Sequence, residues 1–183
     1  MSQILNPNSL DAYDYELPPE LIANFPTFPK EDARLLVYER ASEKISHLKF
    51  GDLPEILPTC DIIFNDTKVV KARIFGKKDS GGETELLLNS PLADGKFSVY
   101  IKGKVRAGSV LNFDRNLAAE VCELFEDGSR TVKFSQNGEP LDTAVLYKIL
   151  SHIGHVPLPP YIKRSDTEDD ESWYQSVFAK NEG

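Results

Sequence analysis

The sequence has 183 residues, of which 40% are hydrophobic and 27% are charged. This composition is that of an ordinary globular protein and excludes a disordered, collagen-like or coiled-coil chain. The net charge of −8 is unevenly spread, because residues 67–115 carry +5 while residues 1–66 carry −7 and residues 116–183 carry −6. A positive segment in an acidic chain fits either a phosphate-contacting element or a solvated surface with uneven charges.

Short elements are predicted in the first third of the chain. Two prolines at the start of residues 17–25 favour a short helix there. The apolar runs at 34–39 and 45–50, joined by polar residues, predict a β-hairpin. Residues 52–57 predict one helical turn, and residues 61–65 predict a buried strand that ends at a polar loop.

The pattern changes from residue 68 to about residue 135, where glycine-containing turns separate strand-like runs. Phe97, Val99 and Ile101 alternate with polar neighbours, so that one face of this run is apolar. Short strands at this spacing predict a small antiparallel barrel or sandwich. The turn signals lie at residues 79–82, 94–95, 107–108, 127–128 and 137–138.

An amphipathic helix is predicted over residues 142–153, with Asp142 or Thr143 as its N-cap and Gly154 at its end. Three prolines then force an extended segment over residues 155–162. The order of elements predicts a mixed α+β fold. In it, a small antiparallel β-barrel domain of residues 67–138 is inserted into a larger α/β domain made of residues 1–66 and 139–183.

The sequence also favours a cytoplasmic location. No apolar run approaches the ~20 residues of a membrane span, so no membrane contact is expected. Residues 1–11 lack the basic and apolar regions of a signal peptide. Cys60 and Cys122 stand alone, without the spacing of a zinc site, and are interpreted as buried thiols in a reducing compartment.

Several polar and proline-rich motifs, taken in order, resemble those of one family. Residues 63–69 read IFNDTKV, residues 153–162 read IGHVPLPPYI and residues 174–179 read YQSVFA. In this order, the motifs resemble the S-adenosylmethionine:tRNA ribosyltransferase-isomerase family of queuosine biosynthesis. Further matching stretches are residues 13–23, 33–37, 72–76, 80–82 and 85–87.

The resemblance implies an enzyme that moves the ribosyl part of S-adenosylmethionine onto the 7-aminomethyl-7-deazaguanine wobble base of tRNA, giving epoxyqueuosine. S-adenosylmethionine is then a consumed co-substrate, and no metal is expected. Two departures from the family pattern stand out: Lys71 replaces a usual proline, and the family continues beyond Gly183. We therefore expect the α/β barrel-like domain to be incomplete and this chain to be inactive alone. The oligomeric state is left open.

The resemblance and the residue types together single out candidate site residues. Asp66 and His155 are the catalytic candidates, because a carboxylate and an imidazole can move protons. The alternatives are an Asx turn at residues 65–67 and a helix-capping role for His155. Substrate binding is expected from Asn65, Thr67, Lys68, Arg73 and Tyr161, and tRNA binding from Lys71, Lys102, Lys104 and Arg106.

The binding roles of Lys68, Arg73 and Tyr161 have alternatives, and so does the function itself. Lys68 and Arg73 could equally lie on a solvated strand face, and Tyr161 could pack against the barrel instead of stacking on a base. Residues 80–82 fit either a phosphate-binding loop or a plain hairpin turn. A non-catalytic RNA-binding β-barrel module is the alternative function, and binding of S-adenosylmethionine would discriminate it from the enzyme.

Overall fold

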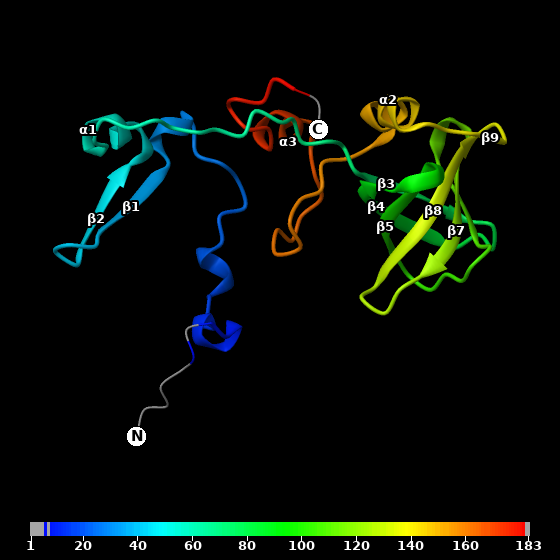
Figure 1. The fold of residues 1–183 in the computed structure, drawn as a ribbon, viewed down its shortest axis with the longest axis horizontal. Coiled ribbons are helices and arrows are strands. Elements are labelled where there is room, and N and C mark those ends of the chain that lie inside the picture. Colours follow the sequence, from blue (N-terminus) through cyan, green and yellow to red (C-terminus); the bar gives the residue numbers. More distant parts are fainter. Residues whose placement is uncertain (1–5, 7, 182–183) are drawn as a thin grey trace. The chain divides into compact units, whose positions relative to one another are not determined.

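The computed structural model describes residue 6 and residues 8–181. The absence of a signal peptide was predicted from residues 1–11, and residues 1–5 and 7 of this segment lie outside the described residues. The chain divides into two compact units. The first unit is residues 1–60 with 160–164, and the second is residues 61–159 with 165–183. Figure 1 follows the elements of both units along the chain.

The first unit is built around a two-stranded hairpin. Strands β1 (Arg34–Glu39) and β2 (Lys44–Lys49) pair antiparallel, which confirms the predicted hairpin. The short helix α1 (Leu53–Ile56) confirms the predicted helical turn. The helix expected over residues 17–25 is only the 3-10 turn Pro19–Leu21. Ile22 directly after this turn is already extended, and Pro26 further disfavours the helical conformation at Phe25.

Single 3-10 turns make up the remaining helical structure of the first unit. None of the described residues in 8–60 is buried, and Leu36, Tyr38 and Ile45 of the hairpin are more than half exposed. A two-stranded hairpin is marginally stable on its own in water. The 3-10 turns besides Pro19–Leu21 are Leu10–Tyr13, Lys30–Asp32 and Phe50–Asp52.

The second unit contains a closed six-stranded antiparallel barrel, which confirms the predicted mixed fold with a small β-barrel. Its strands neighbour one another in the order β5-β4-β3-β6-β7-β8, and pairing between β5 and β8 closes the ring. A short strand β9 (Glu139–Pro140) pairs with β8. The six barrel strands are β3 (Arg73–Lys78), β4 (Glu83–Pro91), β5 (Lys96–Lys102), β6 (Val110–Asn112), β7 (Leu117–Leu124) and β8 (Ser129–Gln136).

The barrel core is formed by the alternating side chains of these strands. Leu86, Val99, Val121 and Val132 are 0% exposed, and each comes from a different strand. Most of the predicted glycine turns connect neighbouring strands of this barrel: residues 79–82 join β3 to β4, and Asp127 and Gly128 lie between β7 and β8. The residues that carry the apolar alternation therefore face one common core.

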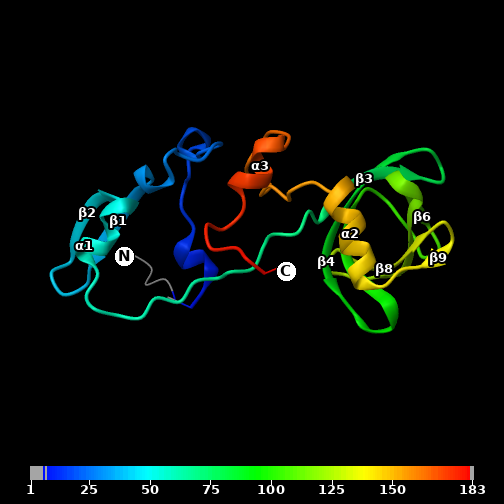
Figure 2. The same ribbon diagram turned by 90° about the horizontal axis from the view of Figure 1, so that it is seen from above.

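Helix α2 (Thr143–Ile153) packs against the barrel, as both ribbon views show (Figure 2). The Asp142 carboxylate accepts a hydrogen bond from the Val145 backbone N–H at 2.8 Å, so that the predicted N-cap is confirmed. Leu146, Ile149 and Leu150 share the hydrophobic core of the barrel. A second helix, α3 (Glu168–Trp173), follows the extended segment.

One expectation about the second unit is wrong. Residues 61–65 are not a buried strand: they are exposed coil, and the Ile63 side chain is 96% exposed. A strand needs a neighbour for its backbone N–H and C=O groups, and none of the described strands pairs with this run. Phe64 instead stacks on Phe178, with 4.0 Å between the ring centroids.

The two cysteines also differ from expectation. Cys60 is exposed and Cys122 is half-buried, and neither forms a disulfide. Cys122 lies on β7, where an apolar run is interrupted by a bulge between Val121 and Glu123. The assignment of residues 1–66 and 139–183 to one larger domain around an insertion stays a prediction.

Candidate functional site

The first residue of β3, Arg73, and the second residue after α2, His155, lie side by side in the second unit. The Arg73 N–H donates to the His155 carbonyl at 3.2 Å, and the His155 N–H donates to the Arg73 carbonyl at 2.7 Å. This pair of backbone hydrogen bonds joins the segment that leads into the barrel to the segment that follows helix α2. Two of the predicted site residues are therefore brought together.

Gly154 makes this close approach possible. A Cβ at this position would lie 2.2 Å from the Lys71 carbonyl oxygen and 2.6 Å from the Leu150 carbonyl oxygen. Both contacts are far shorter than van der Waals distance, and both involve backbone atoms that cannot turn away. The glycine that ends the helix thus also seats His155 against Arg73.

The Arg73 side chain is held by groups of the same unit. Its Nε lies 3.1 Å from Glu85 Oε1, close enough for an ion pair, although the N–H does not point along a hydrogen bond. Its Nη2 donates to the Leu158 carbonyl at 3.3 Å. Glu85 Oε2 also lies 3.7 Å from Lys102 Nζ. Arg73 therefore helps to fix the extended segment after α2, and is not the freely solvated side chain of a plain strand face.

His155 and Asp166 form a side-chain pair beside this junction. The distance between His155 Nδ1 and Asp166 Oδ2 is 2.8 Å. A carboxylate accepts hydrogen bonds, so this contact places a hydrogen on Nδ1 and leaves Nε2 with a lone pair that can take a proton. The Phe75 ring contacts the imidazole edge-on, with 5.0 Å between the centroids.

These contacts bear on the interpretation of His155 as a helix-capping residue. Its ring bonds to Asp166 rather than to the end of helix α2, where the Gly154 N–H donates to the Leu150 carbonyl. No hydrogen bond from the imidazole to the last turn of α2 is described, so the observed partner of the ring is Asp166. Since the imidazole side chain is 43% exposed while Asp166 is 15% exposed, the pair has the arrangement of an accessible base held by a more buried carboxylate.

The polar loop at residues 65–68 is tied to the C-terminal end of the described chain. Asn65 Oδ1 accepts from the Thr67 N–H at 2.9 Å, which is an Asx turn made by the asparagine rather than by Asp66. Asp66 Oδ2 accepts from Asn181 Nδ2 at 2.7 Å, and the Lys68 N–H donates to the Asn181 carbonyl at 2.7 Å. The Asp66 carboxylate remains exposed and keeps acceptor capacity for a ligand.

A small cavity of about 190 Å³ lies next to this loop. Gln175 fixes one wall of the cavity, because its amide donates to the Val69 carbonyl and accepts from the Val69 N–H, at 2.9 and 2.8 Å. Lys68 thus borders a hollow in the second unit. The residues that line it are Lys68, Val69, Val70, Lys71, Tyr147, Ser151 and Gln175.

Tyr161 belongs to the first unit and borders a cavity of about 620 Å³ there. In the same cavity wall, the Arg164 guanidinium carbon lies 4.6 Å from the centroid of the Phe25 ring, a cation–π contact. Tyr161 is 59% exposed, so its ring is not packed away in a core.

The four residues predicted to contact tRNA have different surroundings. Lys71 is paired with Glu171, with 2.5 Å between Nζ and Oε1, and Lys102 shares Glu85 with Arg73. Lys104 and Arg106 border a separate cavity on the barrel. These basic side chains therefore do not form one continuous patch through shared contacts.

Sequence reasoning missed three residues that position the candidates. Glu85 and Gln175 lie inside motifs of the resemblance, but nothing in the sequence shows that they reach Arg73 and Val69. Asp166 lies among several acidic residues, and only the fold brings it to His155. Among the described residues, no three His, Cys, Asp or Glu side chains cluster in the manner of a metal site.

Comparison with known proteins places the chain in a family. The sequence profile of the queuosine biosynthesis protein family matches residues 10–183. S-adenosylmethionine:tRNA ribosyltransferase-isomerase of Campylobacter fetus is 64% identical over 96% of this chain and 52% of its own length. The protein of the same name from Sulfurimonas denitrificans is 51% identical over 94% of this chain and 51% of its own length.

A solved structure is also similar in sequence. The crystal structure of S-adenosylmethionine tRNA ribosyltransferase from Thermotoga maritima is 34% identical, covers 74% of this chain and 47% of its own chain, and superposes with a TM-score of 0.35. The chain spans about half the length of the curated relatives it matches. With a family profile that matches from residue 10 to residue 183, the chain belongs to the queuosine biosynthesis protein family.

Proposed function

We propose that this chain supplies the N-terminal half of an enzyme that transfers and isomerises the ribosyl group of S-adenosylmethionine. The acceptor is the 7-aminomethyl-7-deazaguanine base at the wobble position of tRNA. The products are epoxyqueuosine in tRNA, adenine and methionine, which together account for every part of the co-substrate. The observation that carries this proposal is the 51–64% identity, over 94–98% of the chain, with relatives that all have this activity in their names.

The His155–Asp166 pair supports a role in proton transfer. The reaction needs a base to remove a proton from the carbon beside the sulfonium, and imidazole is the side chain most often used in that role. Asp166 keeps His155 in the tautomer whose Nε2 accepts a proton. His155 is thus our first candidate for the base, and Asp66 is the second.

The remaining candidates fit binding roles. Lys68 and Arg73 offer cations for the methionine carboxylate or a phosphate. Asn65 and Thr67 offer polar groups for a ribose hydroxyl at the loop that carries Asp66. Tyr161 offers an exposed ring for stacking on a base. A tRNA substrate is consistent with a cytoplasmic location. Among the described helices, none is long and apolar enough to cross a bilayer.

The test uses the chain joined to the second half of a relative, with S-adenosylmethionine and tRNA that carries the deazaguanine precursor. We expect adenine release that depends on this tRNA. His155→Ala should lower the rate at least 100-fold, because a general base contributes about 10²–10⁴-fold. His152→Ala is the matched control, since the hydrogen bonds described for this exposed histidine on α2 stay within its own helix.

The outcome can contradict the proposal at two levels. No tRNA-dependent adenine release by the wild-type protein would remove the enzymatic function. Release by His155→Ala at the rate of His152→Ala would remove only His155 from the catalytic role. We expect the 183-residue chain by itself to release no adenine.

A non-catalytic RNA-binding module remains the second candidate function. It is favoured by one observation, the closed barrel with its own core, because such a barrel needs no second half to present an RNA-binding surface. Calorimetry with S-adenosylmethionine separates the two. The joined protein should bind it if the enzyme proposal holds, whereas RNA binding without any affinity for S-adenosylmethionine would favour the module.

A further inference from the structure

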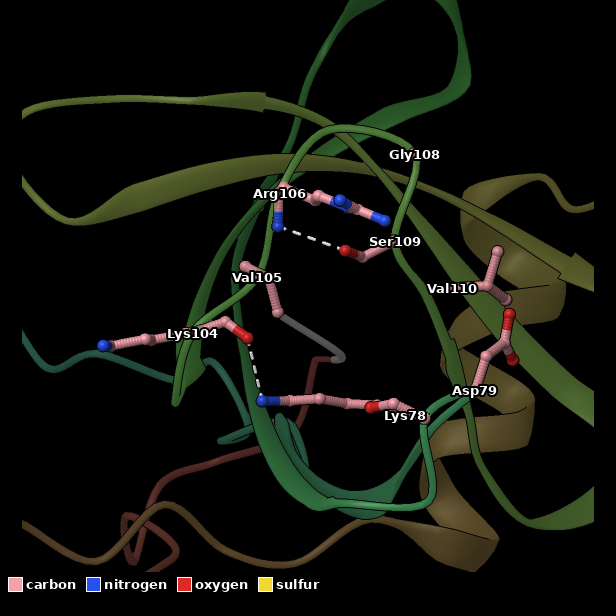
Figure 3. A pocket seen from close by; sticks show the side chains of 9 residues that line it. Lys78, Asp79, Lys104, Val105, Arg106, Gly108, Ser109 and Val110 are labelled. Atoms are coloured by element: carbon pink, nitrogen blue, oxygen red, sulfur yellow. Dashed lines mark hydrogen bonds between the residues drawn. The ribbon is translucent and has the colours of Figure 1, made fainter.

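The barrel carries a cavity of about 480 Å³ that none of the catalytic candidates borders. It lies between the turn after β3 and the loop that leads into β6, and Figure 3 shows it from close by. The first segment contributes Lys78, Asp79 and Ser80. The loop contributes Lys104, Val105, Arg106, Gly108, Ser109 and Val110.

The loop that forms one wall has a fixed shape. The Arg106 N–H donates to Ser109 Oγ at 3.1 Å, and the Ser109 N–H donates back to the Arg106 carbonyl at 3.0 Å. Gly103 and Gly108 have φ angles of +95° and +81°, a region that side chains rarely tolerate. The loop therefore has a defined conformation that these hydrogen bonds and the two glycines stabilise.

Lys78 is held in place across the floor of this cavity. Its Nζ donates to the Lys104 carbonyl at 2.9 Å, a bond drawn in Figure 3, and a Cβ at Gly103 would lie only 3.1 Å from the same Nζ. An ammonium has three N–H donors, so two remain for a ligand. Because the long side chain is already ordered, binding a ligand loses little rotamer entropy.

The charge at this cavity is positive and unpaired. Lys71, Lys96 and Lys102 each have a carboxylate within 4 Å, whereas no carboxylate of the described residues lies that close to a cationic group of Lys78, Lys104 or Arg106. Asp79 is the one acidic residue among those that line the cavity, and its Oδ1 accepts from Asn112 Nδ2 at 2.6 Å. The lining residues therefore include three cations and one anion, although Figure 3 shows the Lys104 ammonium directed away from the cavity, which leaves Lys78 and Arg106 as the cations at it.

We propose that this cavity binds a backbone phosphate of RNA, with Lys78 and Arg106 as its two cationic contacts. The proposal rests on the proposed tRNA substrate. Most lining residues, including Arg106, Gly108 and Ser80, are exposed, so the site is open at the surface. An open site buries too little of a small anion to hold it tightly, whereas a polymer adds contacts elsewhere on its chain.

The experiment measures binding of the 183-residue chain to a fluorescently labelled tRNA transcript by anisotropy over a series of salt concentrations. Arg106→Ala and Lys78→Ala should each weaken binding about five- to tenfold at 0.1 M salt and reduce the salt slope by about 1, because one phosphate contact is lost. Lys133→Ala removes one exposed cation from β8, on a strand that does not border the cavity, and is the matched control, with affinity expected within twofold of wild type.

Two further variants separate the contact from the shape of the loop. Arg106→Lys and Lys78→Arg keep the charge, and each should restore more than half of the lost affinity if the cation contacts phosphate. If Lys78→Ala and Lys78→Arg bind equally poorly while Arg106→Ala matches Lys133→Ala, the effect lies in the loop alone and the proposal is wrong.

A competition experiment distinguishes a phosphate of the tRNA backbone from free inorganic phosphate. Inorganic phosphate, added at constant ionic strength, should displace labelled tRNA only at concentrations far above those of unlabelled tRNA. If inorganic phosphate binds wild type and not Arg106→Ala, while both bind tRNA equally, the cavity holds a small anion and the proposal is overturned. Because the readout is binding, its failure is distinguishable from a failure of tRNA-dependent adenine release.

Discussion

The barrel and the first unit differ in how far their apolar side chains are buried. In the barrel, Leu86, Val99 and Val132 are completely buried, and every strand of the ring has two neighbours. In the first unit, Leu36 and Ile45 of the hairpin are 60% and 57% exposed, and none of the residues described in 8–60 is buried. The two regions have similar local elements but only one has a core.

The difference shows where each region takes its stability from. A closed ring of strands leaves no unpaired edge and hides its apolar face from water by itself. A two-stranded hairpin with exposed apolar residues needs a surface from outside its own unit. Since the relatives are about twice as long as this chain, we expect that surface in the part of the relatives that lies beyond the match.

The largest expected effect comes from a matched pair of leucines. Leu86→Ala should lower the free energy of unfolding by about 2–5 kcal/mol, because it opens a cavity in the barrel core. Leu36→Ala in the hairpin should change it by less than about 0.5 kcal/mol. Urea denaturation of the 183-residue chain gives both values. Equal losses would mean that the first unit has a core of its own.

A smaller effect is expected at the junction that carries the candidate site. Gly154→Ala should destabilise the second unit by about 1–3 kcal/mol, since the added methyl overlaps the Lys71 and Leu150 carbonyls. Gly82→Ala is its control, because the nearest atom to a Cβ there is 4.0 Å away. Thermal denaturation measures both variants. If Gly154→Ala and Gly82→Ala unfold at the same temperature, the junction is not tightly packed.

Loss of the helix cap should have a still smaller effect. Asp142→Ala removes the acceptor of the Val145 N–H and should lower stability by about 1 kcal/mol. Asp142→Asn keeps an acceptor oxygen and should restore most of the loss. If both variants were as stable as wild type, α2 would be held to the barrel by its apolar stripe alone.

The smallest effect concerns a surface turn of the barrel. The hydrogen bonds from the Ser129 hydroxyl and then from its backbone N–H lower the pKa of Asp127 below its usual 3.8. This contribution to stability is present above pH 3.8 and is lost as the pH falls through the lower folded-state pKa. Ser129→Ala should move the pKa upward, as NMR titration of the Asp127 carboxyl can measure. An unchanged pKa would exclude the hydroxyl as the cause.

The same contrast explains what the sequence could predict. The barrel, the hairpin and helix α2 are recognisable because alternation, glycine turns and an N-cap are local signals. The prediction of a strand at residues 61–65 is wrong, because an apolar run in the sequence does not show whether a partner strand exists. The sequence identifies Arg73 and His155 as candidate site residues. It does not identify Glu85 and Asp166, because only the folded chain brings Glu85 to Arg73 and Asp166 to His155.

Hydrogen–deuterium exchange of the 183-residue chain tests the central comparison most directly. Amides of the barrel strands between residues 74 and 136 should exchange only through global unfolding, whereas amides of β1 and β2 should exchange orders of magnitude faster. Adding the second half of a relative should then slow exchange in the hairpin and leave the barrel unchanged. Equal protection of the hairpin and the barrel in the chain alone would contradict the account.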